Sequence, residues 1–170
     1  MSVKLISHST APKDSELDNV QDLIAYCAKV SNPNNQINKE TSEKLIKFLI
    51  KHNHWSPLEM VSVCLEIETT RDIAHQIVRH RSFAFQEFSQ RYANPEEMGD
   101  QFVTRECRLQ DTKNRQNSID TENMELIVSW DEKQQEVIDK AKEVYDWAIE
   151  NGIAKEQARV VLPEGCTKTR

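Results

Sequence analysis

The residues best suited to chemistry lie close together, between Arg79 and Tyr92, in the stretch RHRSFAFQEFSQRY. This stretch mixes arginines and a histidine with aromatic residues, in a chain whose formal net charge is -6. Arginine suits anions with several oxygens, such as phosphate, because its planar guanidinium presents paired donors and stays charged. The stretch therefore predicts a local anion-binding site within an acidic protein.

The first part of the stretch follows a predicted helix. TRDIAHQIVRHR, residues 70–81, has apolar residues at helical spacing, an acidic residue early and basic residues late, which the helix dipole favours. On this helix Gln76, Arg79 and His80 would face the same way, because they are three and four residues apart. We expect their donors to converge on an anion or a polarised carbonyl, with Arg81 beside them.

The second part of the stretch is predicted to be extended. EFSQRYA is rich in aromatic residues and has few helix signals. Glu87, Ser89 and Arg91 would then share one face of the segment. A carboxylate, a hydroxyl and a guanidinium on one face could bind the polar edge and the phosphate of a nucleotide. Ser89 is assigned to binding, since no neighbouring base activates it as a nucleophile.

The alternative is that these arginines form ordinary ion pairs on a solvated surface. The carboxylates that could pair with them are those of Glu66, Glu68, Glu87 and Glu96. Against this, the cations alternate with four aromatic residues that we expect to be buried, Phe83, Phe85, Phe88 and Tyr92. Buried cations need partners or ligands. His80 could act as a general acid or base, but no Asp-His-Ser spacing supports a serine hydrolase.

Periodicity predicts the elements that position these residues. Strands are expected at Val3–Ser7 and in MVSVCLEIE, residues 60–68, where apolar and polar residues alternate as in a half-buried strand. Helices are expected around residues 20–28, 39–53, 131–152 and 155–162, and the polar segment 94–123 as a long excursion. This order predicts an α+β fold, a single domain over residues 1–170 with a twisted, largely antiparallel sheet flanked by helices.

Composition excludes several classes of function. The 22 Lys and Arg residues against 28 Asp and Glu disfavour binding to nucleic acid or to anionic membranes. The N-terminus lacks the apolar run of a signal peptide and no apolar stretch has the length of a membrane span, so a cytoplasmic location is expected. The cysteines are scattered, which favours reduced thiols, with Cys64 buried in its strand. His52 and His54 have no Cys or carboxylate cluster beside them, so no metal site is expected.

The chain resembles a known family. Arg79, His80 and Arg81, then seven residues, then Ser89, resemble the RHR-x7-S signature of the flavin-dependent thymidylate synthases, the thymidylate synthase complementing protein family. Further stretches in family order are AKVSNP, KHNHWSPLE and EQARVVLP, so the resemblance covers the whole chain. Ala84 stands where the family usually has serine, and Gln86 where it usually has asparagine.

The resemblance implies reductive methylation of dUMP to dTMP, with methylenetetrahydrofolate as the carbon donor, NADPH as the reductant and FAD as the electron carrier. Carried over residue by residue, it implies that FAD is bound by Ser56, Arg79, His80, Arg81 and Glu87. It implies that dUMP is bound by Gln76, Arg79, Glu87, Phe88, Ser89, Gln90, Arg91 and Arg159. No residue of this chain is implied to be catalytic with certainty. Homotetramers with sites shared between subunits are also implied.

The resemblance further implies residues beyond Arg170, because family members continue with an Asn-Ala-Arg segment that binds flavin and with a later arginine. The 170 residues are therefore expected to be impaired or inactive on their own. The main alternative function is a nucleotide- or flavin-binding module without turnover. A nucleic-acid-binding protein is a second alternative, since aromatic residues beside cations can stack bases, but the acidic charge disfavours it.

Overall fold

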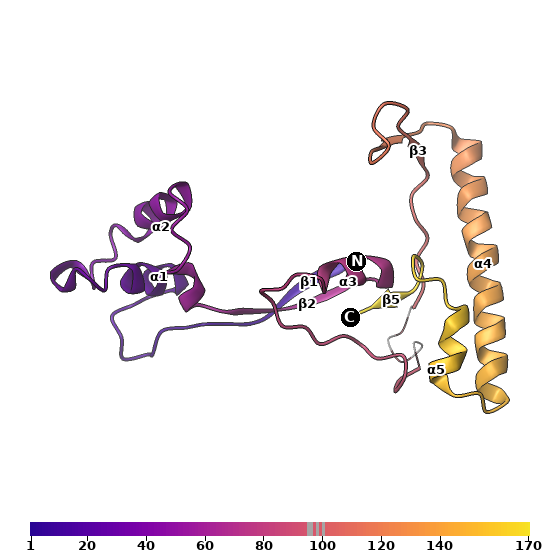
Figure 1. Cartoon of the computed structure of the whole chain (residues 1–170), viewed down its shortest axis with the longest axis horizontal. Coiled ribbons are helices and arrows are strands. Elements are labelled where there is room, and N and C mark those ends of the chain that lie inside the picture. The colour runs from indigo at the N-terminus through magenta and orange to yellow at the C-terminus, as the bar shows by residue number, and fades with distance from the viewer. Residues whose placement is uncertain (95–96, 98, 100) are drawn as a thin grey trace. The chain divides into compact units, whose positions relative to one another are not determined.

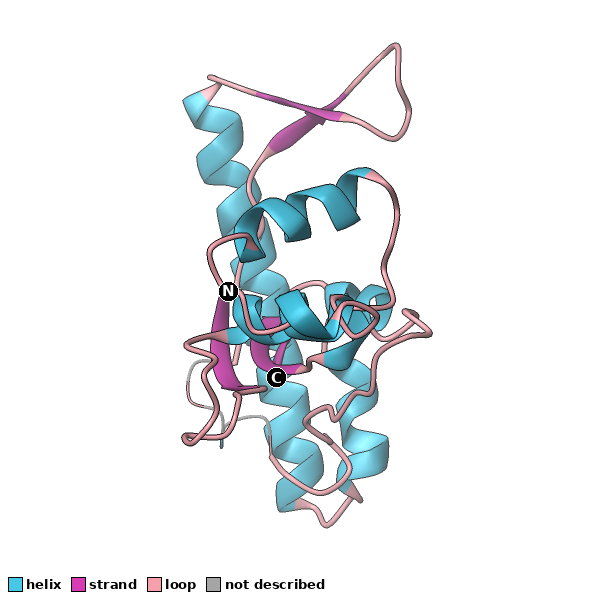
Figure 2. Cartoon of the chain, turned by 90° about the vertical axis from the view of Figure 1, so that its left-hand side faces the viewer, coloured by secondary structure: helices cyan, strands magenta, loops and turns pink. Residues whose placement is uncertain are grey.

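A computed structural model describes residues 1–94, 97, 99 and 101–170. Its backbone divides into two compact units. The first unit is Val3–Glu66, and the second unit is Met1–Ser2 with Ile67–Arg170. Helices make up more of the described chain than strands do (Figure 2).

The first unit is built around two helices that contact each other, α1 and α2 (Figure 1). Asn19 caps α1, because its Oδ1 accepts a hydrogen bond of 3.0 Å from the backbone N–H of Asp22. Ile24 of α1 and Leu49 of α2 are buried, as their helical spacing predicts. The elements are β1 (Ser2–His8), α1 (Val20–Ala28), η1 (Pro33–Asn35), α2 (Ser42–Lys51), η2 (Leu58–Met60) and the first half of β2 (Val63–Thr70).

The strands β1 and β2 form where alternation predicts strands, and they are neighbours in a sheet of order β1-β2-β5. The prediction of a half-buried strand is wrong for the first half of β2, since Val63 and Leu65 are exposed. The prediction of a buried Cys64 is also wrong, because this thiol is exposed. Alternation decides which side chains share a face of a strand, but not whether another layer of the same chain covers that face.

The second unit combines short strands with the longest helix of the described chain. β5 pairs antiparallel with the end of β2, in the register Thr69 to Thr169 and Thr70 to Lys168. β3 and β4 form an antiparallel hairpin, so the prediction of an irregular excursion over 94–123 is wrong at 108–120. The elements are α3 (Arg71–Ile77), β3 (Arg108–Gln110), β4 (Ser118–Asp120), α4 (Met124–Glu150), α5 (Lys155–Ala158), η4 (Arg159–Val161) and β5 (Lys168–Thr169).

The core of the second unit lies where α4 meets the short helices α5 and η4 (Figure 1). It consists of the buried residues Tyr145, Ala148, Ala158 and Leu162, with Phe102, Ile149 and Val161 packed against them. The predicted apolar stripe of α4 is thus confirmed in its second half, but Val137 of the predicted stripe is exposed. Gly152 ends the helix with a φ of +74°, as its predicted capping role requires.

The mixture of helices with antiparallel strand pairs confirms the predicted α+β class. The prediction of one domain over residues 1–170 stays a prediction. Among the described residues, no helix is both long enough and apolar enough to span a membrane.

Candidate functional site

The arginine-rich stretch begins just after α3. The helix ends at Ile77. The Val78 amide still donates to a carbonyl four residues back, but the two amides after it donate to carbonyls three residues back, Arg79 to Gln76 (3.3 Å) and His80 to Ile77 (3.1 Å). The prediction that α3 continues through His80 is therefore wrong, because the last turn tightens and the helix stops. Gln76 is exposed within α3, one residue before its end.

Arg79, His80 and Arg81 are all exposed after the end of α3. Over residues 1–94, 97, 99 and 101–170, neither arginine makes an ion pair, and Glu96 lies outside the described residues. The ring of His80 stacks on Phe83, with 4.0 Å between the ring centroids and 12° between the planes. The segment thus presents two unneutralised guanidinium groups beside a stacked pair of rings, in an acidic chain.

The aromatic residues of the stretch are less buried than expected. Phe83 and Tyr92 are exposed, while Phe85 and Phe88 are half-buried. The expectation that all four are buried is therefore wrong for Phe83 and Tyr92. Residues 84–89 have no regular secondary structure, so no sheet or helix face determines which side chains point inward.

The predicted extended segment ends at Ser89, where the chain turns. The carbonyl of Ser89 accepts hydrogen bonds from the amides of Tyr92 (3.0 Å) and Ala93 (3.1 Å), and its hydroxyl accepts one from the amide of Arg91 (3.4 Å). The prediction that Glu87, Ser89 and Arg91 share one extended face is wrong beyond Ser89, because the turn redirects Arg91.

Glu87 and Phe88 are held against the last residues of the chain. The amide of Phe88 donates to the carbonyl of Arg170 (2.8 Å). The Oε1 of Glu87 accepts a hydrogen bond from the Thr169 hydroxyl (3.1 Å) and lies 3.4 Å from Nη1 of Arg71. Arg71 and Thr169 are residues that the sequence did not predict. A signal for Arg71 exists, since a cation at the first position of a helix opposes the helix dipole and calls for a reason.

Gln90 is the most buried residue of the stretch, at 2% exposed. Its Nε2 has no hydrogen-bond partner within the part of the chain that the structure describes. Buried amide donors are nearly always paired, by protein, water or ligand. Gln90 therefore has donor capacity left for a water or a ligand group.

The turn after Ser89 brings the stretch to α5. Nη2 of Arg91 lies 3.0 Å from Oε2 of Glu156, and Nζ of Lys155 donates to the carbonyl of Tyr92 (3.0 Å). Arg159 donates from Nε to the carbonyl of Glu156 (3.3 Å). The resemblance assigns both arginines to dUMP. Arg91 contacts the side chain of Glu156 from 65 residues away in the sequence, and Arg159 contacts the backbone carbonyl of the same residue from three residues away.

A separate polar cluster lies at the start of α3. Arg105 contacts both carboxylate oxygens of Asp72 (2.8 and 3.0 Å), and the Thr70 hydroxyl donates to Asp72 (2.5 Å). Burial favours the neutral carboxyl, but the hydrogen bond from Thr70 and the charge of Arg105 outweigh it and lower the pKa of Asp72. Burial also raises the pKa of the nearby Cys166 thiol, which disfavours its reactive thiolate.

Other candidate positions lie in the first unit. Ser56 is exposed in a turn and accepts, through its carbonyl, a hydrogen bond from the Glu59 amide (3.2 Å). His52 and His54 lie with their rings near that of Phe48. All four cysteines are free thiols. Across residues 1–94, 97, 99 and 101–170, no group of His, Cys, Asp or Glu side chains is arranged to hold a metal ion.

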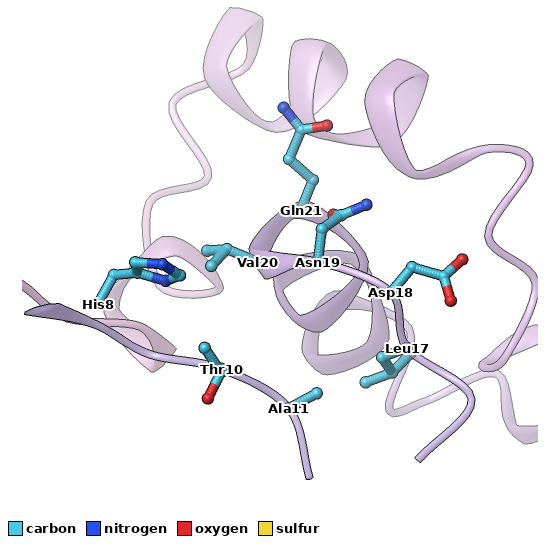
Figure 3. A pocket seen from close by; sticks show the side chains of 8 residues that line it. All are labelled: His8, Thr10, Ala11, Leu17, Asp18, Asn19, Val20 and Gln21. Carbon is cyan, nitrogen blue, oxygen red and sulfur yellow. The ribbon is translucent and has the colours of Figure 1, made fainter. Parts of the chain in front are cut away.

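The first unit also contains a pocket of about 520 Å³ at the start of α1 (Figure 3). Its lining residues are His8, Thr10, Ala11, Leu17, Asp18, Asn19, Val20 and Gln21. None of them belongs to the predicted site. The Asn19 side chain already caps the amide of Asp22, so this donor of the helix start is not available to an anion.

Comparison with known proteins relates the chain to one family. The model of the family described as thymidylate synthase complementing protein matches residues 11–170. The chain is 48% identical over 163 residues to a probable flavin-dependent thymidylate synthase of Paramecium bursaria Chlorella virus 1, covering 96% of this chain and 74% of that protein. It is 46% identical over 166 residues to a flavin-dependent thymidylate synthase of Synechocystis sp., again covering 96% and 74%.

A solved structure has a similar fold. The UMP/dUMP methylase PolB from Streptomyces cacaoi, bound with 5-Br dUMP, superposes with a TM-score of 0.75 at 24% identity, covering 99% of this chain and 69% of that one. At this identity the likeness concerns the fold alone. Together with the family match over residues 11–170, these findings show that the chain belongs to the thymidylate synthase complementing protein family.

Proposed function

We propose that this protein is a flavin-dependent thymidylate synthase, a methyltransferase that converts dUMP to dTMP. The proposal is supported by the family match and by the names of the relatives at 46% and 48% identity. The single observation that carries it is the exposed Arg79-His80-Arg81 cluster, which has no acidic partner among the described residues of an acidic chain.

The residues around this cluster fit FAD. The pyrophosphate of FAD carries negative charge on several oxygens, which two free guanidinium groups can bind through paired donors. We assign Arg79, His80, Arg81 and Glu87 to FAD. The family resemblance adds Ser56, which lies in the first unit. The stacked rings of His80 and Phe83 add a flat apolar surface next to these charges. A flavin bound there would supply the hydride that turns a transferred methylene carbon into a methyl group.

The dUMP site is proposed along the rest of the stretch and α5. Arg91 contacts the carboxylate of Glu156 and Arg159 contacts its backbone carbonyl, so both arginines lie beside this residue, and we propose that they bind the phosphate of dUMP. The buried Gln90 amide has a donor available for a carbonyl oxygen of a base or for a bridging water. The full proposed set is Gln76, Arg79, Glu87, Phe88, Ser89, Gln90, Arg91 and Arg159.

The overall reaction balances with two further substrates. Methylenetetrahydrofolate supplies one carbon with two hydrogens. NADPH and a proton supply the two further hydrogens that are needed, so the products are dTMP, tetrahydrofolate and NADP⁺. The protein's own residues bind, orient and exclude water in this scheme. Ser89 is a binding residue rather than a nucleophile. Its hydroxyl accepts a hydrogen bond from the Arg91 amide, and within the part of the chain that the structure describes no basic side chain contacts this hydroxyl.

The remaining proposals concern the whole protein. We propose that residues 1–170 belong to one family domain, that the protein is a cytoplasmic homotetramer, and that sites are shared between its subunits. The exposed apolar side chains Val63 and Leu65 of β2 are consistent with contacts to another subunit.

Turnover tests this function directly. The purified chain is incubated with dUMP, methylenetetrahydrofolate, FAD and NADPH, and dTMP is measured by chromatography together with NADPH oxidation. Formation of dTMP that requires all four compounds supports the proposal. Binding of FAD and dUMP without dTMP would instead identify a binding module without turnover, and binding of neither would contradict the proposed site.

A further inference from the structure

We propose that Arg71 is a positioning residue that fixes the carboxylate of Glu87 in the ligand site. This inference rests on the proposed function, in which Glu87 contacts both FAD and dUMP. Arg71 itself is not placed against either ligand. It acts from the first position of α3, 16 residues before Glu87 in the sequence.

The burial of Arg71 is the first observation. Its side chain is 10% exposed, although arginine is rarely buried unless it is paired. Its guanidinium contacts two carboxylates, Glu87 through Nη1 (3.4 Å) and Glu164 through Nε (3.3 Å). Nη2 lies 3.4 Å from the His75 ring nitrogen. A guanidinium held by several partners in this way has little freedom to move, so the Glu87 oxygen that it contacts is constrained as well.

The hydrogen bonds of Glu87 are the second observation. Both recorded partners, Arg71 and the Thr169 hydroxyl, bind the same oxygen, Oε1. Within the part of the chain that the structure describes, Oε2 has no recorded partner, and the side chain is 29% exposed. One oxygen is therefore anchored by the protein while the other remains available to accept a hydrogen bond from a ligand hydroxyl or N–H.

The backbone around both residues is also fixed. The amide of Arg71 donates to the carbonyl of Thr167 (3.0 Å), and the amide of Phe88 donates to the carbonyl of Arg170 (2.8 Å). The residues on either side of the ion pair are thus tied to the same C-terminal segment. This arrangement holds a carboxylate by a rigid set of partners, as a precise binding site requires.

The position of Arg71 is otherwise unfavourable. A positive side chain in the first turn of a helix is destabilising, because the helix dipole is positive there. Desolvating its charge adds a further cost. The pairing with Glu87 and Glu164 gives a reason for an arginine at this position that helix stability does not provide.

The test is a double-mutant cycle read out by ligand affinity. Arg71→Gln, Glu87→Gln and the double variant are titrated with FAD by flavin fluorescence and with dUMP by calorimetry, in the full chain. We expect each single variant to lose about tenfold in affinity for at least one ligand, because a charge-assisted contact is lost or misplaced. We expect the double variant to bind no more weakly than Glu87→Gln alone, because Arg71 acts through Glu87.

Two further variants separate positioning from folding. Arg105→Lys alters a neighbouring arginine that pairs with Asp72 and does not contact Glu87, so it should keep the wild-type affinity for both ligands. Arg71→Lys keeps the charge, so it should bind both ligands more tightly than Arg71→Gln. It also provides a test if Arg71→Gln folds poorly. Wild-type affinity in both Arg71 variants, or losses that multiply in the double variant, would overturn the assignment of Arg71. A wild-type chain that binds neither ligand would overturn the proposed function as well.

Discussion

Arg91 and Glu156 form an ion pair with 3.0 Å between Nη2 and Oε2, although 65 residues separate them in the sequence. Arg159 donates to the carbonyl of the same glutamate at 3.3 Å. In the proposed function both arginines bind the phosphate of dUMP. The Glu156 carboxylate would then compete with that phosphate for Arg91.

Replacing Glu156 should therefore strengthen dUMP binding. We expect Glu156→Gln to lower the Kd for dUMP by about two- to fivefold, because an exposed ion pair of this kind contributes little more than that and its loss frees Arg91. Calorimetric titration measures the change. Glu143→Gln, which removes a similar exposed carboxylate paired with Lys140, is the matched control and should have no effect. Weaker binding in Glu156→Gln would show instead that Glu156 orients Arg91 for the ligand.

Ser89 should affect binding more than turnover. Loss of a single hydroxyl that binds substrate is expected to raise the KM for dUMP by roughly two- to tenfold in Ser89→Ala, with kcat changed less. Steady-state kinetics separate the two constants. Ser118→Ala, on β4, is a control outside the proposed site. A fall in kcat of more than about a thousandfold, typical of a lost nucleophile, would contradict the binding role.

The ion pair of Asp72 should make stability depend on pH. The pKa of Asp72 is lowered in the folded state, so its contribution is present above the unfolded pKa of about 3.9 and is lost as the pH falls through the folded value. We expect Asp72→Asn to be less stable than wild type at about pH 7, and the difference to shrink below about pH 4.

Urea unfolding at these two pH values measures the effect. Asp131→Asn, at an exposed position of α4, is the control and should not change the pH dependence. An equal difference in unfolding free energy between Asp72→Asn and wild type at both pH values would show that the charge of Asp72 is not the cause.

The core of the second unit should depend on Leu162. This side chain is 7% exposed and packs in the cluster with Tyr145, Ala148 and Ala158, so Leu162→Ala should cost about 2–5 kcal/mol of unfolding free energy. Val160, two residues away, is 83% exposed, and Val160→Ala should change the free energy by less than about 0.5 kcal/mol. Equal effects of the two substitutions in chemical denaturation would contradict the assignment of this core.

Local sequence patterns predicted the positions of the helices better than they predicted which side chains are buried. The spacing of apolar residues identified α1, α2 and α4, because a helix shows its buried face through a period set by its own geometry. The exposure of Cys64 and Phe83 was not predictable, since burial depends on which other segments cover a side chain. The helix that stops at Ile77 and the turn at Ser89 depend on local backbone bonds that no apolar period reveals.

For the candidate site, too, the sequence indicated the kind of site but not the contacts between distant segments. The types of residue in the stretch 79–92 indicated an anion site, because several guanidinium groups lie together in an acidic chain and suit an anion with several oxygens. The contact of Arg91 with Glu156, and that of Glu87 with Arg71, join distant segments and required the fold. Arg71 is the residue whose unfavourable place at a helix start could have been noticed in the sequence.

Binding of a flavin by Arg79 and Arg81 is measured directly by the visible absorption of the purified protein after incubation with FAD and gel filtration. We predict that the wild-type chain retains oxidised flavin, and that Arg79→Ala combined with Arg81→Ala loses it. Lys113→Ala combined with Arg115→Ala removes two cations near the β3–β4 turn and should retain the flavin. A wild-type chain that retains no flavin, or an Arg79 and Arg81 variant that retains as much as wild type, would contradict the claim.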